Sequence, residues 1–250
     1  MLDPTLGRWI VLDPLSEDFY SYSTYYSMMN NPILFVDPDG RAAKWIPGAD
    51  GEAITYTEKD GKLVVSDNAT EDTKTLVNYI NESGSEKAKD QFKAVADSKG
   101  KVNLAIDKEN TGANGVRLFG LHQPHDADGK ALNWDSKTQS FDGTAETIKD
   151  ENGNLIYKEA TITIFDKNFN DDVVNSLSVL DKTGVFDPLL TKSNTITGTF
   201  AHEVDHNLNQ NTIKTVVDRS NGIKNNYSVE PPAYKVQKQV HQEILNNRKK

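Results

Sequence analysis

The segment His202-Glu203-Val204-Asp205-His206 contains two histidines, with a glutamate directly after the first of them. On a helix, residues four apart lie on the same face, so the imidazoles of His202 and His206 can bind one metal ion. The glutamate then stands beside a water on that ion and can accept its proton. Because the chain has no cysteine, the other ligands must be His, Asp or Glu. The spacing predicts a Zn²⁺ site for hydrolysis, with His202 and His206 as ligands and Glu203 as general base.

The residues around this motif have the pattern of an amphipathic helix, which we expect from Thr195 to Leu208, with Ser193 or Asn194 as its N-cap. At 100° per residue, the polar residues of the segment share an arc of about 100°, and the apolar residues lie on the other side. The polar arc holds Thr199, His202, Glu203 and His206, and the apolar side holds Phe200, Ala201, Val204 and Leu208. One side should carry the site and the other should pack in the core. The alternative is an ordinary helix with two surface histidines.

A catalytic zinc site usually has three protein ligands, so a third must be found. The longer motif, with Gly and His at the third and sixth residues after the second histidine, is absent because Asn and Thr stand there. Glu230 is the preferred candidate, since it directly precedes a helical segment, Pro231–Asn246, that tolerates proline in its first turn. Asp218 and His241 are the alternatives. Glu230 could also serve only to favour the positive end of the helix dipole.

Other residues are candidates for supporting roles. Tyr227 or Tyr234 could hydrogen-bond the transition-state oxyanion, although a tyrosine near a helix start more often packs in a core. Gly198, one turn before the motif, would let another element approach the site helix closely. His122 and His125 form a second histidine pair, but we expect both in an exposed loop rather than on a metal.

Two hairpins are predicted from turn residues. Asp60-Gly61 between alternating arms indicates a hairpin over Ile54–Ser66, and Asn152-Gly153 indicates a second one. The return arm of the second, Tyr157–Phe165, alternates apolar and polar residues as a half-buried strand does. Part of this arm is the expected edge strand that aligns an extended peptide substrate by backbone hydrogen bonds. The residues of that edge are Thr161, Ile162, Thr163 and Ile164.

The remaining elements that must position the site are short. We expect helices over Glu71–Ile80 and Glu86–Ala96, strands over Lys101–Ile106 and Gly115–Phe119, and a turn-rich loop over His122–Asp135. Together with the two later helices, these elements predict an α+β fold with a small mixed or antiparallel sheet.

Composition excludes several classes of function. A net charge of −9 argues against a nucleic-acid-binding protein, which needs clustered Lys and Arg. Residues 211–250 are locally basic, with eight Lys or Arg against three Asp or Glu, and we interpret this stretch as a solvated helix face. No apolar run approaches the roughly 18 residues of a membrane span, and no export signal is recognisable. With 36% hydrophobic residues and a mean hydropathy of −0.63, we expect a soluble globular domain with a smaller appendage.

Residues 1–41 differ from the rest, because Asp-Pro and Asn-Pro steps divide them into short turns and extended pieces. This stretch contains the segments LDPTLGRW, DPLSE, YSTYYSMMNNP and DPDG. With these segments it resembles the core-associated tip of Rhs and YD-repeat proteins. In that family the tip ends a large repeat shell, which encloses a C-terminal toxin that varies between members. The resemblance implies that everything after about Gly40 is an effector.

The toxin part resembles the zincin-like metallopeptidase effectors of the gluzincin type, in which H-E-x-x-H is completed by a downstream glutamate. The matching positions are His202, Glu203, His206 and Glu230. We therefore expect three parts: a tip segment at 1–41, a linker and hairpin at 42–66, and a zincin-like metallopeptidase domain at 67–250.

The hypothesis that follows is a zinc-dependent metallopeptidase effector, delivered into a target cell as part of a larger secreted protein and acting there on a protein or peptide. The resemblance implies two further partners, a cognate immunity protein and the Rhs shell of the parent protein. The alternatives are a non-catalytic zincin-like binding module, an inactive orphan toxin cassette, and a zinc amidase acting on a non-protein amide.

Overall fold

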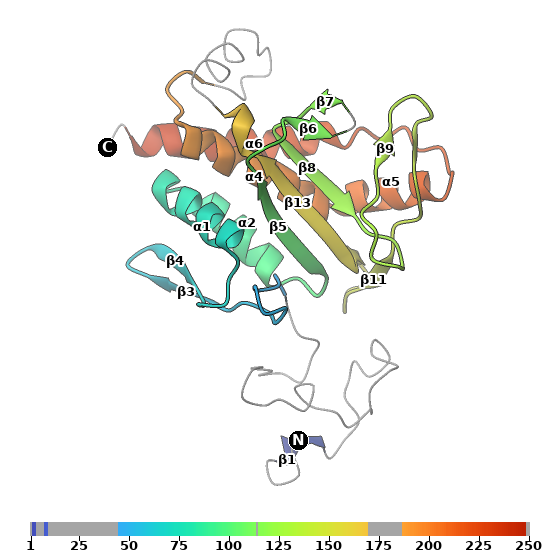
Figure 1. The fold of residues 1–250 in the computed structure, drawn as a ribbon, viewed down its shortest axis with the longest axis horizontal. Coiled ribbons are helices and arrows are strands. Elements are labelled where there is room, and N and C mark those ends of the chain that lie inside the picture. The colour runs from blue at the N-terminus through green and yellow to red at the C-terminus, as the bar shows by residue number, and fades with distance from the viewer. Residues whose placement is uncertain (1, 4–7, 10–44, 114, 170–186, 249–250) are drawn as a thin grey trace. The chain divides into compact units, whose positions relative to one another are not determined.

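The computed structural model describes residues 2–3, 8–9, 45–113, 115–169 and 187–248, and the chain divides into two units, 1–44 and 45–250 (Figure 1). In the first unit, strand β1 (Leu2–Asp3) pairs antiparallel with β2 (Arg8–Trp9). The remaining predictions for the tip segment fall outside the described residues. The second unit contains helices and strands together, which confirms the α+β class.

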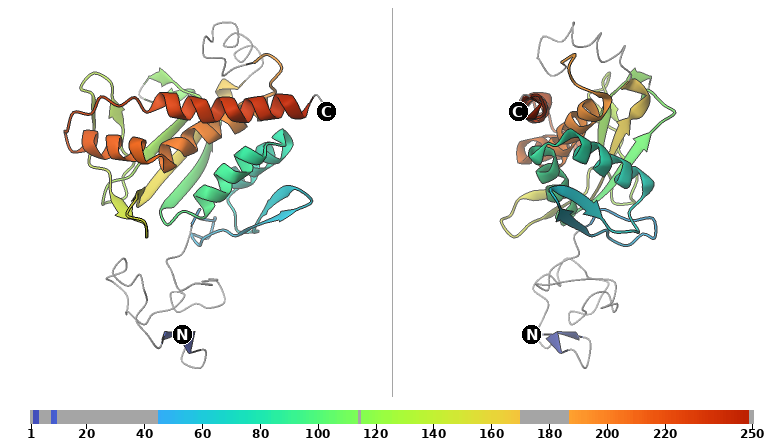
Figure 2. Two further views of the ribbon diagram at one scale, coloured as in Figure 1. Left: turned by 180° about the vertical axis from the view of Figure 1, so that it is seen from behind. Right: turned by 90° about the vertical axis from the view of Figure 1, so that its left-hand side faces the viewer.

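The largest sheet in the described part of the second unit has three strands. It consists of β5 (Lys101–Asp107), β13 (Glu159–Phe165) and β8 (Gly120–Pro124), in the order β5-β13-β8. Strand β13 runs parallel to β5 and antiparallel to β8, so the sheet is mixed. Alternate side chains of β5 and β13 are buried on one face, and the helices cover that face (Figure 2). This alternation explains why both strands were predictable from their pattern.

The predicted edge strand is wrong, because Thr161–Ile164 lies in the middle of the sheet. Each of these residues pairs with β5 on one side and with β8 on the other. An alternating pattern indicates that one face of a strand is buried, but it does not distinguish an edge strand from a central one. The edge positions belong instead to β5 and β8, each of which pairs with β13 on one side only among the described strands.

Shorter strands flank the sheet in hairpins. The second hairpin forms as predicted, from β11 (Thr147–Lys149) and β12 (Leu155–Tyr157), but its return strand ends at Tyr157 and β13 is a separate strand. The predicted strand over Gly115–Phe119 shrinks to a two-residue β7. The other short strands are β6 (Gly112–Ala113), β7 (Val116–Arg117), β9 (Trp134–Asp135) and β10 (Ser140–Phe141).

The helices follow the predicted bounds closely where capping residues mark them. Helix α1 runs over Glu71–Ser83, with Thr70 as N-cap and Gly84 in the left-handed conformation at its C-terminus. The others are α2 (Glu86–Ala96), η3 (Asp166–Asn168), α4 (Lys192–Leu208), α5 (Gln210–Ser220) and α6 (Glu230–Asn247). None of the helices that the structure describes is both long enough and apolar enough to cross a membrane.

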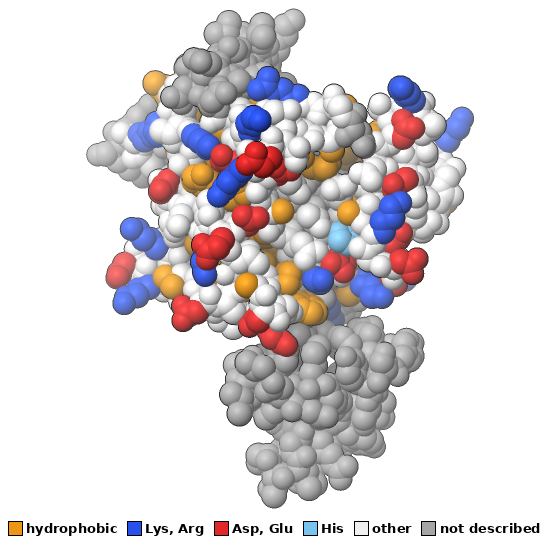
Figure 3. Space-filling view, in the orientation of Figure 1, with side chains coloured by type: hydrophobic (Ala, Val, Ile, Leu, Met, Phe, Trp, Pro, Cys, Tyr) orange, Lys and Arg blue, Asp and Glu red, His pale blue; other side chains and the backbone are white. Residues whose placement is uncertain are grey.

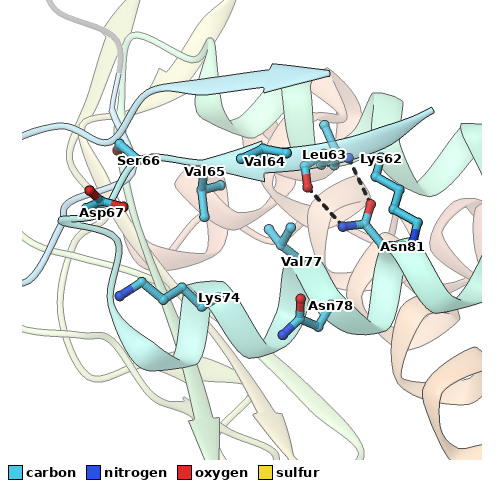
Figure 4. Close-up of a pocket in the computed structure, with 10 residues that line it drawn as sticks. All are labelled: Lys62, Leu63, Val64, Val65, Ser66, Asp67, Lys74, Val77, Asn78 and Asn81. Atoms are coloured by element: carbon cyan, nitrogen blue, oxygen red, sulfur yellow. Dashed lines mark hydrogen bonds between the residues drawn. The ribbon is translucent and has the colours of Figure 1, made fainter. Parts of the chain in front are cut away.

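The first hairpin also forms as predicted, from β3 (Tyr56–Lys59) and β4 (Lys62–Val65), with Asp60 and Gly61 at positive φ. Its outer edge is covered by Asn81 of α1, as Figure 4 shows. The Asn81 amide donates to the carbonyl of Leu63 and accepts from its N–H, both at 2.9 Å. A side-chain amide thus takes the place of a neighbouring strand and satisfies an edge that would otherwise be open to pairing.

Replacing Asn81 with alanine is therefore expected to lower the free energy of unfolding by about 1–2 kcal/mol, because two hydrogen bonds to half-buried backbone groups are lost. Urea unfolding measures the change. Asn78→Ala is the matched control, since Asn78 is an exposed asparagine on the same helix that also lines the groove beside β4. Equal losses for the two variants would mean that the amide does not stabilise the hairpin.

Charged side chains of both signs are mixed on the side of the second unit that Figure 3 draws. Among the described residues there, Lys and Arg are interspersed with Asp and Glu. Because opposite charges alternate there, this side offers no broad field of one sign for a charged partner.

Candidate metal centre

Helix α4 forms the centre of the second unit and is buried on nearly all sides. It packs against α6, α1 and α2 and against the sheet through β8 and β13. Phe200, Ala201 and Val204 are fully buried, as predicted for the core side. The polar side is buried too, because α6 and β8 cover it.

The N-terminus of α4 lies earlier than predicted. Thr191 is the N-cap and accepts from the backbone of Asn194, whose side chain accepts from the Thr191 N–H in return. The predicted caps, Ser193 and Asn194, are therefore both inside the helix. Asn194 contributes at the third helical position as the second half of a capping box.

Three side chains from α4 and α6 converge at one point. The Nε2 atoms of His202 and His206 lie 3.1 Å apart. Glu230 places one carboxylate oxygen 3.3 Å from Nε2 of His202 and the other 3.6 Å from Nε2 of His206. All three residues offer ligand atoms within 4.8 Å of one another, so the group can hold a metal ion.

The spacing of these atoms fits a small tetrahedral ion. With bonds of about 2.0–2.1 Å, two ligands of a tetrahedral zinc lie about 3.3 Å apart, close to the three distances between the ligand atoms. The Nε2 atoms of His202 and His206, which face each other at 3.1 Å, cannot both carry protons, so at least one offers a lone pair. The carboxylate of Glu230 beside them adds the negative charge that favours a cation. Two imidazoles and one carboxylate are also a donor set that zinc favours in catalytic sites.

The rival third ligands make other contacts. Asp218 accepts from the side-chain amide of Asn225 at 2.8 Å. His241 is buried where α6 crosses α4, and a Cβ added at Gly198 would lie 2.0 Å from its Nε2 atom. The predicted close approach at Gly198 is therefore confirmed, and the approaching group is the His241 ring. Of the three candidates, Glu230 is the one that the structure places beside both histidines.

Glu203 is buried against the backbone of β8. The pKa of its carboxyl group is raised to about 7, mainly by burial and also by the negative charge of Glu230, while the charge of His202 and the backbone N–H of His122 act in the opposite direction. A Cβ on Gly120 would lie 2.5 Å from Oε1 of Glu203, so only a glycine leaves room for the carboxylate. Sequence analysis missed this contact. Gly120, an isolated glycine within β8, was the only sequence feature that could have indicated the contact.

The second histidine pair does not share a metal ion. His122 and His125 are three residues apart across the end of β8, and their side chains face opposite sides of the strand. Nε2–H of His122 donates to Oδ1 of Asn207 at 3.1 Å, and burial lowers the pKa of the His122 ring to about 3. His125 instead lies 2.9 Å from the hydroxyl of Thr161. The predicted exposed loop is wrong for both histidines, because His122 lies in strand β8 beside the site and His125 is buried.

Of the two candidate tyrosines, the structure brings Tyr234 to the site. Its ring meets the ring of His202 edge to face, with 4.7 Å between centroids, and its side chain remains 40% exposed. Tyr227 lies in the connection between α5 and α6, where its backbone carbonyl accepts from Arg219. A role of Tyr234 in stabilising the oxyanion stays a prediction.

Comparison of the chain with family models, with curated proteins and with solved structures gave no match. The chemistry of the site therefore rests on the positions of its own residues.

Proposed function

We propose that this chain is a zinc-dependent metallopeptidase of the zincin-like, gluzincin type, in which His202, His206 and Glu230 hold the ion and Glu203 is the general base. The observation that carries the proposal is the convergence of these three ligand groups from two helices, with distances of 3.1–3.6 Å between ligand atoms. A buried carboxylate directly after the first histidine supports the catalytic part of the proposal.

The chain's own residues account for the proton transfers. Zinc, when bound, supplies a Lewis acid that lowers the pKa of a water and polarises the scissile carbonyl. Glu203 accepts the proton of the attacking water and passes it to the leaving amine. Burial raises the pKa of this carboxyl group above its ordinary value, which favours both steps because a general base works best when its pKa lies near the working pH. We propose that Tyr234, whose ring meets that of His202 edge to face, hydrogen-bonds the developing oxyanion.

The proposed substrate is a protein or peptide bound in an extended conformation along β8. This strand has β13 as a neighbour on one side only among the described strands. On its other side the backbone N–H of His122 bonds Glu203 and the carbonyl of Pro124 accepts from Leu132, so a peptide would pair with the first part of the strand. An extended peptide can pair with such an edge through backbone hydrogen bonds, which gives affinity with little sequence preference. The substrate strand proposed here is β8, in place of Thr161–Ile164.

The biological setting is proposed from the resemblance of residues 1–41 to the Rhs tip. The chain would be the effector end of a larger secreted protein, carried inside its shell and delivered into a target cell. A cognate immunity protein would protect the producer.

Labelling of new N-termini tests the proposed function. Zinc-loaded protein is incubated with a bacterial lysate, and protein N-termini that appear with time are compared with those from chelator-treated protein and from Glu203→Gln. The expected result is a set of new N-termini that only the zinc-loaded wild type produces. Zinc binding without any such N-termini would favour the non-catalytic or amidase alternatives, and N-termini that persist in Glu203→Gln would contradict the assigned base.

A further inference from the structure

Glu230 is the ligand that packing holds least. Its side chain is 51% exposed, whereas those of His202 and His206 are 8% and 11% exposed. It is the first residue of α6, and Val229 before it provides no side-chain cap. Something outside the helix must fix the direction in which Glu230 enters the site.

Arg219 holds the chain segment that precedes Glu230 through hydrogen bonds to its backbone. Its Nε and Nη2 atoms donate to the carbonyl of Asn225 at 3.2 and 3.0 Å, and Nη2 also donates to the carbonyl of Tyr227 at 2.9 Å. These carbonyls lie five and three residues before Glu230. Asn225 in turn accepts from the Tyr227 N–H through its side chain and donates to Asp218. One guanidinium thus holds the last part of the connection between α5 and α6.

The guanidinium is itself held in place. It lies over the ring of Trp134, 5.3 Å from the ring centroid. That ring packs edge to face on Phe141, with 5.1 Å between centroids, across the β9–β10 hairpin. Arg219 is also fixed at its Cα by the last turn of α5. The guanidinium is thus held between an aromatic ring on one side and two backbone carbonyls on the other, as a positioning residue requires.

We propose that Arg219 is a positioning residue for the metal ligand Glu230, acting through the carbonyls of Asn225 and Tyr227. The inference rests on the proposed metal centre. The planar fork of an arginine reaches both carbonyls at once, and lysine, with a single ammonium, cannot reproduce that geometry. If the connection is loosened, the Glu230 carboxylate can move away from the two imidazoles, and a zinc ion would then be bound less tightly.

The test is the zinc affinity of the full chain, measured by competition with a chromogenic chelator. Arg219→Lys is expected to weaken zinc binding about tenfold, the low end of the range for residues that support ligands. Arg248→Lys is the matched control, because Arg248 donates to the carbonyl of Leu189 and to Asn194 from the other end of α6. Its zinc affinity should stay within twofold of wild type. The visible spectrum of the cobalt-substituted protein should change in Arg219→Lys only.

A double-mutant comparison separates positioning from a general loss of stability. In a Glu230→Ala background, Arg219→Lys should not weaken zinc binding further, because the ligand it positions is gone. If Arg219→Lys does not fold, Trp134→Leu provides the second variant, with an expected loss of a few-fold. An unchanged affinity in the folded variants, or equal losses with and without Glu230, would overturn the inference alone. A wild-type chain that binds no zinc would overturn the metal centre and the inference with it.

Discussion

Replacing Glu203 with glutamine is expected to reduce the rate of peptide hydrolysis by about 10²–10⁴-fold, the usual contribution of a general base. The amide keeps the size of the side chain but cannot accept a proton from the attacking water. Zinc affinity should be kept, because Glu203 is not among the three converging ligands. The rate is measured on a peptide cleaved by the wild type, and the zinc content of the variant is measured in parallel.

Asp205→Asn is the control for this change. It makes the same substitution on the same helix, at a half-buried carboxylate that accepts from the side chain of Asn209. Its activity should stay close to that of the wild type. If Glu203→Gln keeps most of the activity while binding zinc, another group takes the proton and the assigned base is wrong.

Replacing Gly120 with alanine is expected to reduce hydrolysis by about 100-fold, again without loss of zinc. The new Cβ would lie 2.5 Å from Oε1 and 2.7 Å from Cγ of Glu203, so the carboxylate must move by about 1 Å to restore ordinary contact. A displacement of about 1 Å in a catalytic group can cost roughly 100-fold in rate. Because the displaced group is the end of a flexible side chain, the fold should tolerate the change.

Gly143→Ala serves as the control for crowding. A Cβ there would lie 2.7 Å from a methyl group of Leu132, also a movable side chain, but away from Glu203. Both variants should melt within a few degrees of the wild type, and only Gly120→Ala should lose activity. Full activity in Gly120→Ala would show that Glu203 does not need its position against β8.

The parts of the site that lie close together in sequence were predictable. The spacing of His202 and His206 depends only on the helical repeat, and the helix follows from the local pattern. Helices α1 and α2 match their predicted positions because Thr70, Ser85 and Gly84 mark their ends. Glu230 was identified through its place before two prolines, a local signal as well.

The parts that depend on contacts between distant residues were not predictable. Glu203 meets Gly120 and His122 across about 80 residues of chain, and β8 carries too little apolar alternation to identify it as a strand. The parallel pairing of β13 with β5 places Thr161 in the middle of the sheet, a fact of topology rather than of local pattern. Helix α5 was missed because only Asn209 separates it from α4.

The central position of α4 has a consequence for how activity fails on heating. The helix that presents both histidines is surrounded by α1, α2, α6 and the sheet, so it cannot fray or swing out while those elements remain packed. Exposure of its backbone amides to hydrogen exchange therefore requires opening of the whole unit. The two histidines should therefore stay in place on heating until the unit melts cooperatively, whereas the third ligand, at the start of α6, depends on the connection before it.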